Sequence, residues 1–196
     1  MQHEDEPMSD ALPDEELMLR VRNDEVERLA DLFERYHVAL FSFFVRLTGD
    51  PPASEDLVQD TFYRLLKYRR TYKPGTSFRT WLYQIARNVR NDRFHRQRDE
   101  IGIEAAPMAT VLPVDTVEDQ EQSARLKQAL MELPPDKREL LLLSRYQGLK
   151  YEEIAKLLQC EVGTVKVRVH RALQDLKERF HRRELGRRRP QGNLGG

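Results

Sequence analysis

The chain has 196 residues, and its 33 basic and 33 acidic residues give a formal net charge of zero. That length suits one or two small domains. The single cysteine, Cys160, excludes an intramolecular disulfide and a two-thiol metal cage, and we expect it to pack as a small apolar side chain. No apolar run approaches the ~18–20 residues of a membrane span, and the acidic N-terminus is unlike a signal peptide. We therefore expect a cytoplasmic protein.

The zero net charge is an average of blocks of opposite sign. Residues 1–19 hold seven acidic residues and no Lys or Arg, and residues 101–124 hold five acidic residues and no Lys or Arg. Residues 61–100 hold eleven basic and three acidic side chains, a net charge of +8. Residues 125–196 hold seventeen basic and nine acidic side chains, which again gives +8. Two basic modules separated by an acidic connector favour nucleic acid as the partner, because phosphate contacts release counterions. The acidic segments should oppose non-specific DNA binding.

The first module, residues 13–98, shows apolar residues at helical spacing. This pattern predicts a short helix opened by Pro13 and its acidic followers, then helices over about residues 25–47, 54–68 and 76–97. The stretch from Gly49 to Pro52 separates the second helix from the third, and Ser54 is the expected N-cap of the third. Residues 1–12 lack this periodicity, so we expect a disordered acidic leader.

Residues 99–122 contain proline, glycine and acids without sustained periodicity, which predicts a flexible linker. In the second module, residues 123–181, one helix ends at Pro134 and the next runs from Pro135 to Tyr146, with Gly148 in the position that ends a helix. Residues 182–196 form a basic tail that should fray. Because no strand pattern competes, the expected fold class is all-α, two small helical domains joined by a flexible linker.

Residues 151–173 are the most informative stretch. Val165, Val169, Ala172 and Leu176 advance by four, three and four residues and make one buried stripe, and a short helix with the small Ala155 precedes them. This is a helix-turn-helix pattern. The opposite side carries Lys166, Val167, His170 and Arg171, which can reach base edges or phosphates in the major groove. An arbitrary basic helix more often has a merely solvated face, and His170 fits either interpretation equally.

Together the two modules resemble the extracytoplasmic-function (ECF) group of the sigma-70 family of bacterial RNA polymerase sigma factors. SEDLVQDTFYRLLKY and PGTSFRTWLYQIARNVRNDRFHR look like sigma domain 2, and LPPDKRELLLLSRYQGLKYEEIAKLLQCEVGTVKVRVHRAL looks like sigma domain 4. The resemblance implies an alternative sigma factor that binds core polymerase through the clamp helices and flap and directs promoter-specific initiation. It also implies control by a separate anti-sigma factor, and no catalytic residue, cofactor or metal.

The resemblance assigns three surfaces. A mostly acidic strip at helical spacing would dock the clamp helices: Asp56, Gln59, Asp60 and Tyr63. Without the resemblance, the same strip would be read as an ordinary solvated face. The helix-turn-helix would read the −35 element with Thr164, Lys166, Val167, Arg168, His170 and Arg171. Aromatics beside cations suit single-stranded DNA, so the third surface would read and melt the −10 element with Tyr72, Lys73, Arg79, Arg87, Asn88, Arg90 and Arg93.

Within the −10 surface, Tyr72 and Asn88 are expected to hold a flipped base. Arg87, Arg90 and Arg93 are expected to hold backbone phosphates. Trp81 follows core spacing, so we expect it to be scaffold. Two positions depart from the family pattern. Lys150 replaces the usual Ser or Thr cap, a loss of about 1 kcal/mol unless Lys150 meets a phosphate instead. Val167 replaces the commoner Ser, which leaves the −35 sequence open.

Two other functions compete with this interpretation. A DNA-binding regulator that acts alone would explain the second module but not the aromatic and basic helix of the first, which also lacks the βα alternation of a receiver domain. An enzyme is less favoured, because the sequence has no phosphate-binding glycine loop, no paired metal-ligand motif and no nucleophile beside an obvious base.

Overall fold

The protein is described by a computed structural model that places residues 12–101 and 117–187. The basic end of the tail, the middle of the predicted linker and almost all of the acidic leader lie outside these described residues. Helices are the regular elements throughout the described ranges, which agrees with the predicted all-α class. Among the described residues, no helix is both long and apolar enough to cross a membrane.

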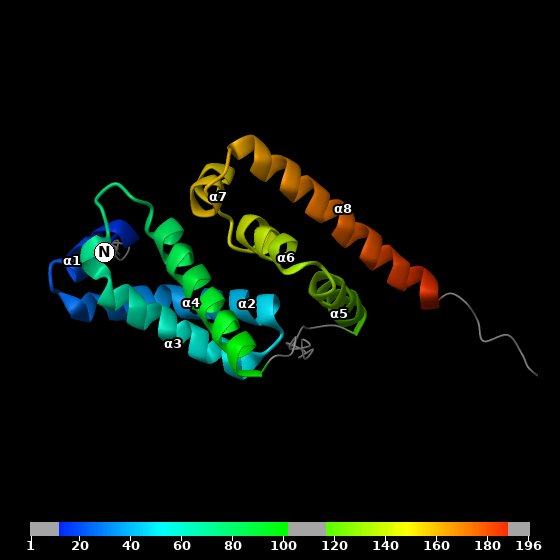
Figure 1. The fold of residues 1–196 in the computed structure, drawn as a ribbon, viewed down its shortest axis with the longest axis horizontal. Helices are drawn as coiled ribbons and strands as arrows, with labels where there is room; N and C mark the ends of the chain where they lie inside the picture. Colours follow the sequence, from blue (N-terminus) through cyan, green and yellow to red (C-terminus); the bar gives the residue numbers. More distant parts are fainter. Residues whose placement is uncertain (1–11, 102–116, 188–196) are drawn as a thin grey trace, which may run out of the picture.

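The first module contains four α-helices, shown in blue to green in Figure 1. They are α1 (Asp14–Arg22), α2 (Leu29–Thr48), α3 (Pro51–Lys67) and α4 (Phe78–Ile101), with short 3₁₀ turns η1 (Val26–Arg28) and η2 (Arg69–Thr71) between them. Helix α3 packs against both α2 and α4. The buried aliphatic and aromatic stripes of these helices form the core that the periodicity predicted.

The start of α3 differs from the prediction that Ser54 caps it. Gly49 ends α2 in the left-handed conformation, with φ of 78°, and the helix begins again at once, because Asp50 accepts the backbone N–H of Ala53 at 3.0 Å. Pro51 and Pro52 occupy the first turn, where a helix needs no N–H donor. Ser54 is instead buried and donates its hydroxyl to the carbonyl of Asp50 at 2.6 Å.

The second module consists of α5 (Val117–Met131), α6 (Pro135–Leu141), a π-helical turn η3 (Leu142–Tyr146), α7 (Tyr151–Leu158) and α8 (Val162–Arg187). Helices α4 and α5 both extend into the segment predicted as linker, so that part of it is helical. Gly148 has a φ of 62° and separates η3 from α7, as expected of a glycine after a helix. Cys160 is half-buried against the core.

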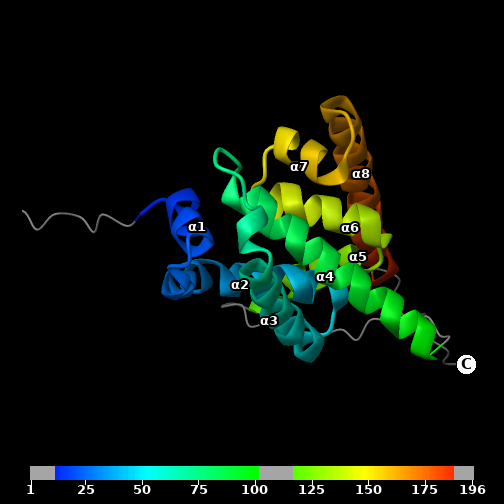
Figure 2. The ribbon, with the colours of Figure 1, turned by 60° about the vertical axis from the view of Figure 1, so that its left-hand side comes forward.

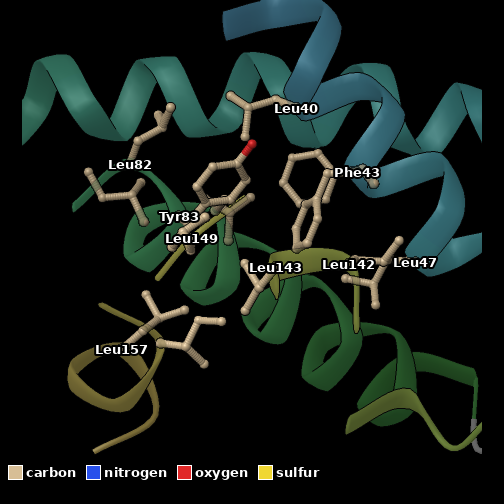
Figure 3. Close-up of a cluster of buried hydrophobic side chains, with 14 of the residues drawn as sticks. Leu40, Phe43, Leu47, Leu82, Tyr83, Leu142, Leu143, Leu149 and Leu157 are labelled. Carbon is tan, nitrogen blue, oxygen red and sulfur yellow. The ribbon is translucent and has the colours of Figure 1, made fainter. Parts of the chain in front are cut away.

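The two modules are packed together, which the sequence analysis did not predict. Helix α7 lies against α4, while α5, α6 and η3 contact α2 (Figures 1 and 2). One hydrophobic cluster runs from the first module into the second (Figure 3): Leu40, Phe43, Leu47, Leu82, Tyr83, Leu142, Leu143, Leu149 and Leu157. The two modules therefore share one continuous hydrophobic core within the described residues.

Candidate nucleic-acid and polymerase interfaces

The helix-turn-helix consists of α7 and α8. Gln159 adopts the left-handed conformation, with φ of 51°, and the N–H of Cys160 donates to the carbonyl of Ala155 at 3.0 Å, which turns the chain sharply between the helices. Val165, Val169 and Ala172 are buried, as their spacing predicted. The opposite side of α8 is open to solvent, since five of its six predicted −35 residues are exposed and Thr164 is half-buried: Lys166, Val167, Arg168, His170 and Arg171.

The missing cap at Lys150 is compensated by Glu153. A lysine side chain cannot accept a hydrogen bond, so one half of a capping box is absent. The other half is present, because Glu153 accepts the backbone N–H of Lys150 at 2.8 Å. The other oxygen of the same carboxylate accepts the hydroxyls of Ser77 and Thr80, each at 2.9 Å. Glu153 therefore both caps α7 and joins it to the start of α4.

The environment of Glu153 lowers its pKa below the usual 4.5. Partial burial by itself would raise this pKa, because it disfavours the charged carboxylate. Hydrogen bonds from Lys150, Thr80 and Ser77, together with the nearby charge of Arg79, outweigh that effect. The carboxylate is thus ionised at neutral pH and can act as a strong acceptor between the modules.

Three side chains of the predicted −10 helix face the second module. Arg79, Tyr83 and Arg87 recur every four residues along α4 and form one stripe. Arg79 donates to the carbonyl of Gln147, and the Tyr83 hydroxyl donates to the Gln147 side-chain oxygen. Arg87 pairs with Glu139 at 2.8 Å and donates to the carbonyl of Leu157 at 3.2 Å. Arg79 and Arg87, two residues of the predicted −10 surface, are therefore occupied by protein acceptors.

Tyr72 is also enclosed, in contrast to the exposed ring expected of a base-stacking residue. Only 1% of it is exposed, its hydroxyl donates to the carbonyl of Thr76 at 2.5 Å, and its ring lies 5.1 Å from that of Trp81. Burial, with the charges of Glu15 and Asp14, raises the pKa of Tyr72 to about 12. The half-buried Trp81 packs against the core, as expected of scaffold. In this conformation Tyr72 also belongs to the core.

The other predicted −10 residues are more open. Lys73 and Asn88 are exposed, and Asn88 lies 3.5 Å from the amide of Gln84. Arg90 is half-buried and donates to Asn91 at 2.7 Å. The predicted −10 surface therefore consists of an exposed part around Lys73 and Asn88 and a covered part on the stripe that faces the second module.

The predicted polymerase-docking strip lies on α3. Tyr63 is 64% exposed, Gln59 is exposed and Asp60 is half-buried. Asp56 is exposed and pairs with Arg93 of α4 at 3.0 Å, so one ion pair connects two surfaces that were predicted separately. Because this pair is solvent-accessible, its contribution to stability is small and both groups remain available to partners.

Sequence reasoning missed the residues that join the modules. Arg138, Glu139 and Gln147 are buried polar side chains of the second module, and each makes a hydrogen bond or ion pair with the first module. The available signal was the position of Arg138 and Glu139 directly before four consecutive leucines, since a charged pair beside a fully apolar run is seldom left unpaired. Among the described residues, no group of three or more His, Cys, Asp or Glu side chains could hold a metal ion.

Comparisons with known proteins agree with this architecture. The profile "Sigma-70 region 2" matches residues 32–100, and "Sigma-70, region 4" matches residues 123–176. The chain is 34% identical to the RNA polymerase sigma factor CarQ of Myxococcus xanthus, over 86% of this chain and 98% of CarQ. It is 28% identical to the ECF RNA polymerase sigma factor SigW of Bacillus subtilis, over 84% and 98% of the respective chains.

Solved structures share the fold. The sigma factor RpoE in complex with the anti-sigma factor NepR from Bartonella quintana matches with a TM-score of 0.65 and 26% identity, over 77% of this chain and 97% of that chain. CnrH in complex with the cytosolic domain of CnrY matches with a TM-score of 0.66 and 24% identity, over 86% and 96% of the respective chains. The second of these likenesses concerns the fold alone.

An all-helical fold that ends in a helix-turn-helix defines this chain as a member of a class of two-module DNA-binding proteins. Within that class, the order of its two matched regions and its 34% identity to CarQ identify the family. The chain belongs to the extracytoplasmic-function group of the sigma-70 family.

Proposed function

We propose that this protein is an alternative sigma factor, a dissociable subunit that binds core RNA polymerase in the cytoplasm and directs it to a particular set of promoters. Region 4 reads duplex DNA at the −35 element, and region 2 reads and holds the opened −10 strand. The protein performs no bond-making chemistry of its own; selection of the start site is its activity. A separate anti-sigma factor is its natural antagonist, as NepR is bound to RpoE in the solved complex.

The observation that carries this proposal is the pairing of two regions of the same family in the expected order, with the −35 face of α8 open to solvent. Lys166 and Arg171 are donors of the kind that read guanine N7 and O6, and Val167 can pack on a thymine methyl group. A regulator that acts alone has no use for region 2. We therefore assign α8 to the −35 element and the α4 surface to the −10 strand.

The proposal is tested by run-off transcription with core polymerase on a pooled library of promoter sequences. The full-length protein should give transcripts with defined start sites and shared sequences at both elements. Core polymerase without it should not. Absence of start-site selection with an active core enzyme would refute the function, and tight duplex binding without core would favour the lone regulator.

The docking strip has its own test, Asp60→Ala, measured as affinity for core polymerase. Removing one carboxylate that steers a basic partner should weaken binding about 2–5-fold, as expected of a loss of roughly 0.5–1 kcal/mol. Glu178→Ala, which removes an exposed carboxylate from α8, is the matched control and should leave core affinity unchanged. Equal affinities for wild type and Asp60→Ala would remove the strip from the interface.

A further inference from the structure

The loop that joins η2 to α4, residues 72–77, has an exposed tip with few side chains. Lys73, Pro74 and Gly75 are exposed. The N–H of Thr76 donates to the carbonyl of Lys73 at 3.1 Å, and Gly75 has a φ of 77°, as in a type II turn with proline and glycine at its centre. Apart from the lysine, this tip offers mainly backbone groups to a partner. What the loop can bind therefore depends on its backbone shape.

The end of the loop that leads into α4 is held by α1. Glu15 accepts the backbone N–H of Phe78, the first residue of α4, at 3.0 Å. The first N–H groups of a helix have no intrahelical acceptor, so this carboxylate acts as a cap although it comes from another helix. Ser77, directly before α4, makes only a long contact of 3.4 Å with the N–H of Thr80. Glu15 therefore helps to fix the point where the loop ends and α4 begins.

The other end of the loop is held by the turn that follows α1. Asp24 accepts hydrogen bonds from Arg69 at 2.7 Å and Arg70 at 2.9 Å, one on each carboxylate oxygen, and both arginines belong to η2. Its φ of 76° lies in the left-handed region, which Asp tolerates better than most residues. The hydrogen bond from Arg69, with the charge of Arg70, lowers the pKa of Asp24 below the usual 3.8. Asp24 is therefore an ionised anchor for η2.

One element thus reaches both ends of the loop. Helix α1 lies beside η2 and the start of α4 (Figures 1 and 2). It is itself fixed, because Leu17, Met18 and Val21 are 0–2% exposed and pack in the core. Glu15 and Asp24 are exposed, and exposed polar contacts add little to the stability of a whole fold. Their contacts at the two ends of one loop point to a local role.

We propose that Glu15 and Asp24 are positioning residues for −10 recognition: they hold residues 72–77 in one shape and so determine how strictly an unpaired base is selected. The inference rests on the proposed role of region 2 in reading the −10 strand. A loop that is fixed before binding loses less conformational freedom and presents one set of contacts. Without these anchors the loop samples shapes that do not distinguish the bases. Both residues precede the range 32–100 that matches region 2.

The test measures base selection at each promoter position. The full-length protein and core polymerase transcribe two pools of templates, one randomised at the −10 element and one at the −35 element, each template with a transcribed barcode. Glu15→Ala removes the acceptor, and Glu15→Gln keeps an amide oxygen that can replace it. Asp24→Asn removes the charge and keeps a residue that tolerates the left-handed conformation. Glu16→Gln and Asp31→Asn are matched controls, because these carboxylates pair with arginines outside the loop and η2.

We expect Glu15→Ala to lower the preference for the favoured base at one −10 position about fivefold, the factor that corresponds to the loss of one helix cap. Glu15→Gln should restore most of this preference, and Asp24→Asn should relax the same position. Base selection at −35 and affinity for core should stay those of wild type, and the controls should change nothing. An even fall in transcription across all sequences would indicate a merely structural role and overturn the proposal. If circular dichroism shows that Glu15→Ala is poorly folded, Asp24→Asn decides the question.

Gly75→Ala tests the loop independently of its anchors. The added methyl group would meet nothing within 4 Å, but alanine disfavours the φ of 77°, so the variant changes the loop shape without a collision. If Gly75→Ala alters −10 selection and neither Glu15→Ala nor Asp24→Asn does, the loop reads the base and the positioning proposal is wrong. If Gly75→Ala also changes nothing, the loop does not read the strand, and the inference fails while the proposed function stands. If the wild type selects no start site, both fail.

Discussion

Replacing Arg138 with methionine should destabilise the protein more than any change to a surface charge. This buried arginine donates to the carbonyls of Leu130 and Leu133, each at 3.0 Å, and to that of Met131. Leu130 and Met131 lie in the last turn of α5, where carbonyls lack the i+4 donor of a continuing helix, and Leu133 follows directly after it. Arg138 also donates at 2.6 Å to the carbonyl of Leu47, in the last turn of α2. One side chain thus completes a helix end in each module.

The magnitude follows from these four acceptors. A hydrogen bond from a charged donor contributes about 1.5–3 kcal/mol, and burying the guanidinium costs part of that sum. Burial, with a smaller effect of Arg90, lowers the pKa of Arg138, but arginine remains charged in proteins. Methionine fills much of the volume and removes this donor from all four carbonyls, of which that of Leu130 keeps the backbone N–H of Leu133 at 3.2 Å. We expect a loss of about 3–5 kcal/mol, or a drop in Tm of about 6–20 °C for a chain of this size.

Urea unfolding followed by circular dichroism measures this loss. Arg138→Lys should recover only part of it, because one ammonium group cannot reach four carbonyls in the geometry of a guanidinium. Arg145→Met, at an exposed position of η3 nearby, is the control and should stay within about 0.5 kcal/mol of wild type. A loss below about 1 kcal/mol for Arg138→Met would refute the reasoning that this residue joins the two helix ends.

Three further predictions concern the site and its supports. The pKa of Glu153 is lowered in the folded state, so its ionised carboxylate stabilises the fold fully above the usual pKa of 4.5, and this stabilisation is lost as pH falls below that value. Glu153→Gln should therefore be less stable than wild type at pH 7. Urea unfolding should show that this difference in the free energy of unfolding shrinks toward pH 3. Asp50→Ala should cost about 1 kcal/mol in the same assay, since it removes the cap of α3, whereas Ser54→Ala should leave that cap intact. Arg171→Ala should weaken promoter binding by roughly 1–3 kcal/mol and relax sequence preference at one position if Arg171 contacts a base; an even loss across sequences, with a smaller salt slope, would assign it to phosphate.

The sequence alone predicted the helix-turn-helix in residue-level detail. Val165, Val169 and Ala172 are buried at the predicted spacing, and the cationic side of α8 is exposed. Periodicity succeeds here because burial of a helix stripe is a local property, repeated every three or four residues. It failed at the start of α3, because the pattern Gly-Asp-Pro-Pro both ends one helix and begins the next, and a rule that treats proline only as a breaker misses the second half.

The packing of the modules could not be predicted in the same way. Its polar contacts join residues far apart in sequence, such as Arg87 with Glu139 and Thr80 with Glu153. No period relates such positions, and each side chain also fits a solvated face. Tyr72 shows the same limit, because an aromatic residue beside lysine suits either a base or the core, and only the fold places its ring against Trp81.

The contacts of α4 also explain how a chain of zero net charge can bind DNA selectively. Its cationic stripe is neutralised within the molecule by Glu139 and by oriented carbonyls, so a diffusing DNA strand meets little free charge there. The apolar contacts of Figure 3 lie beside this stripe and hold the second module against it. Because those side chains are fully buried, truncating Leu143 to alanine should lower the free energy of unfolding by about 2–5 kcal/mol. That loss should exceed the loss from removing any single charge of the stripe.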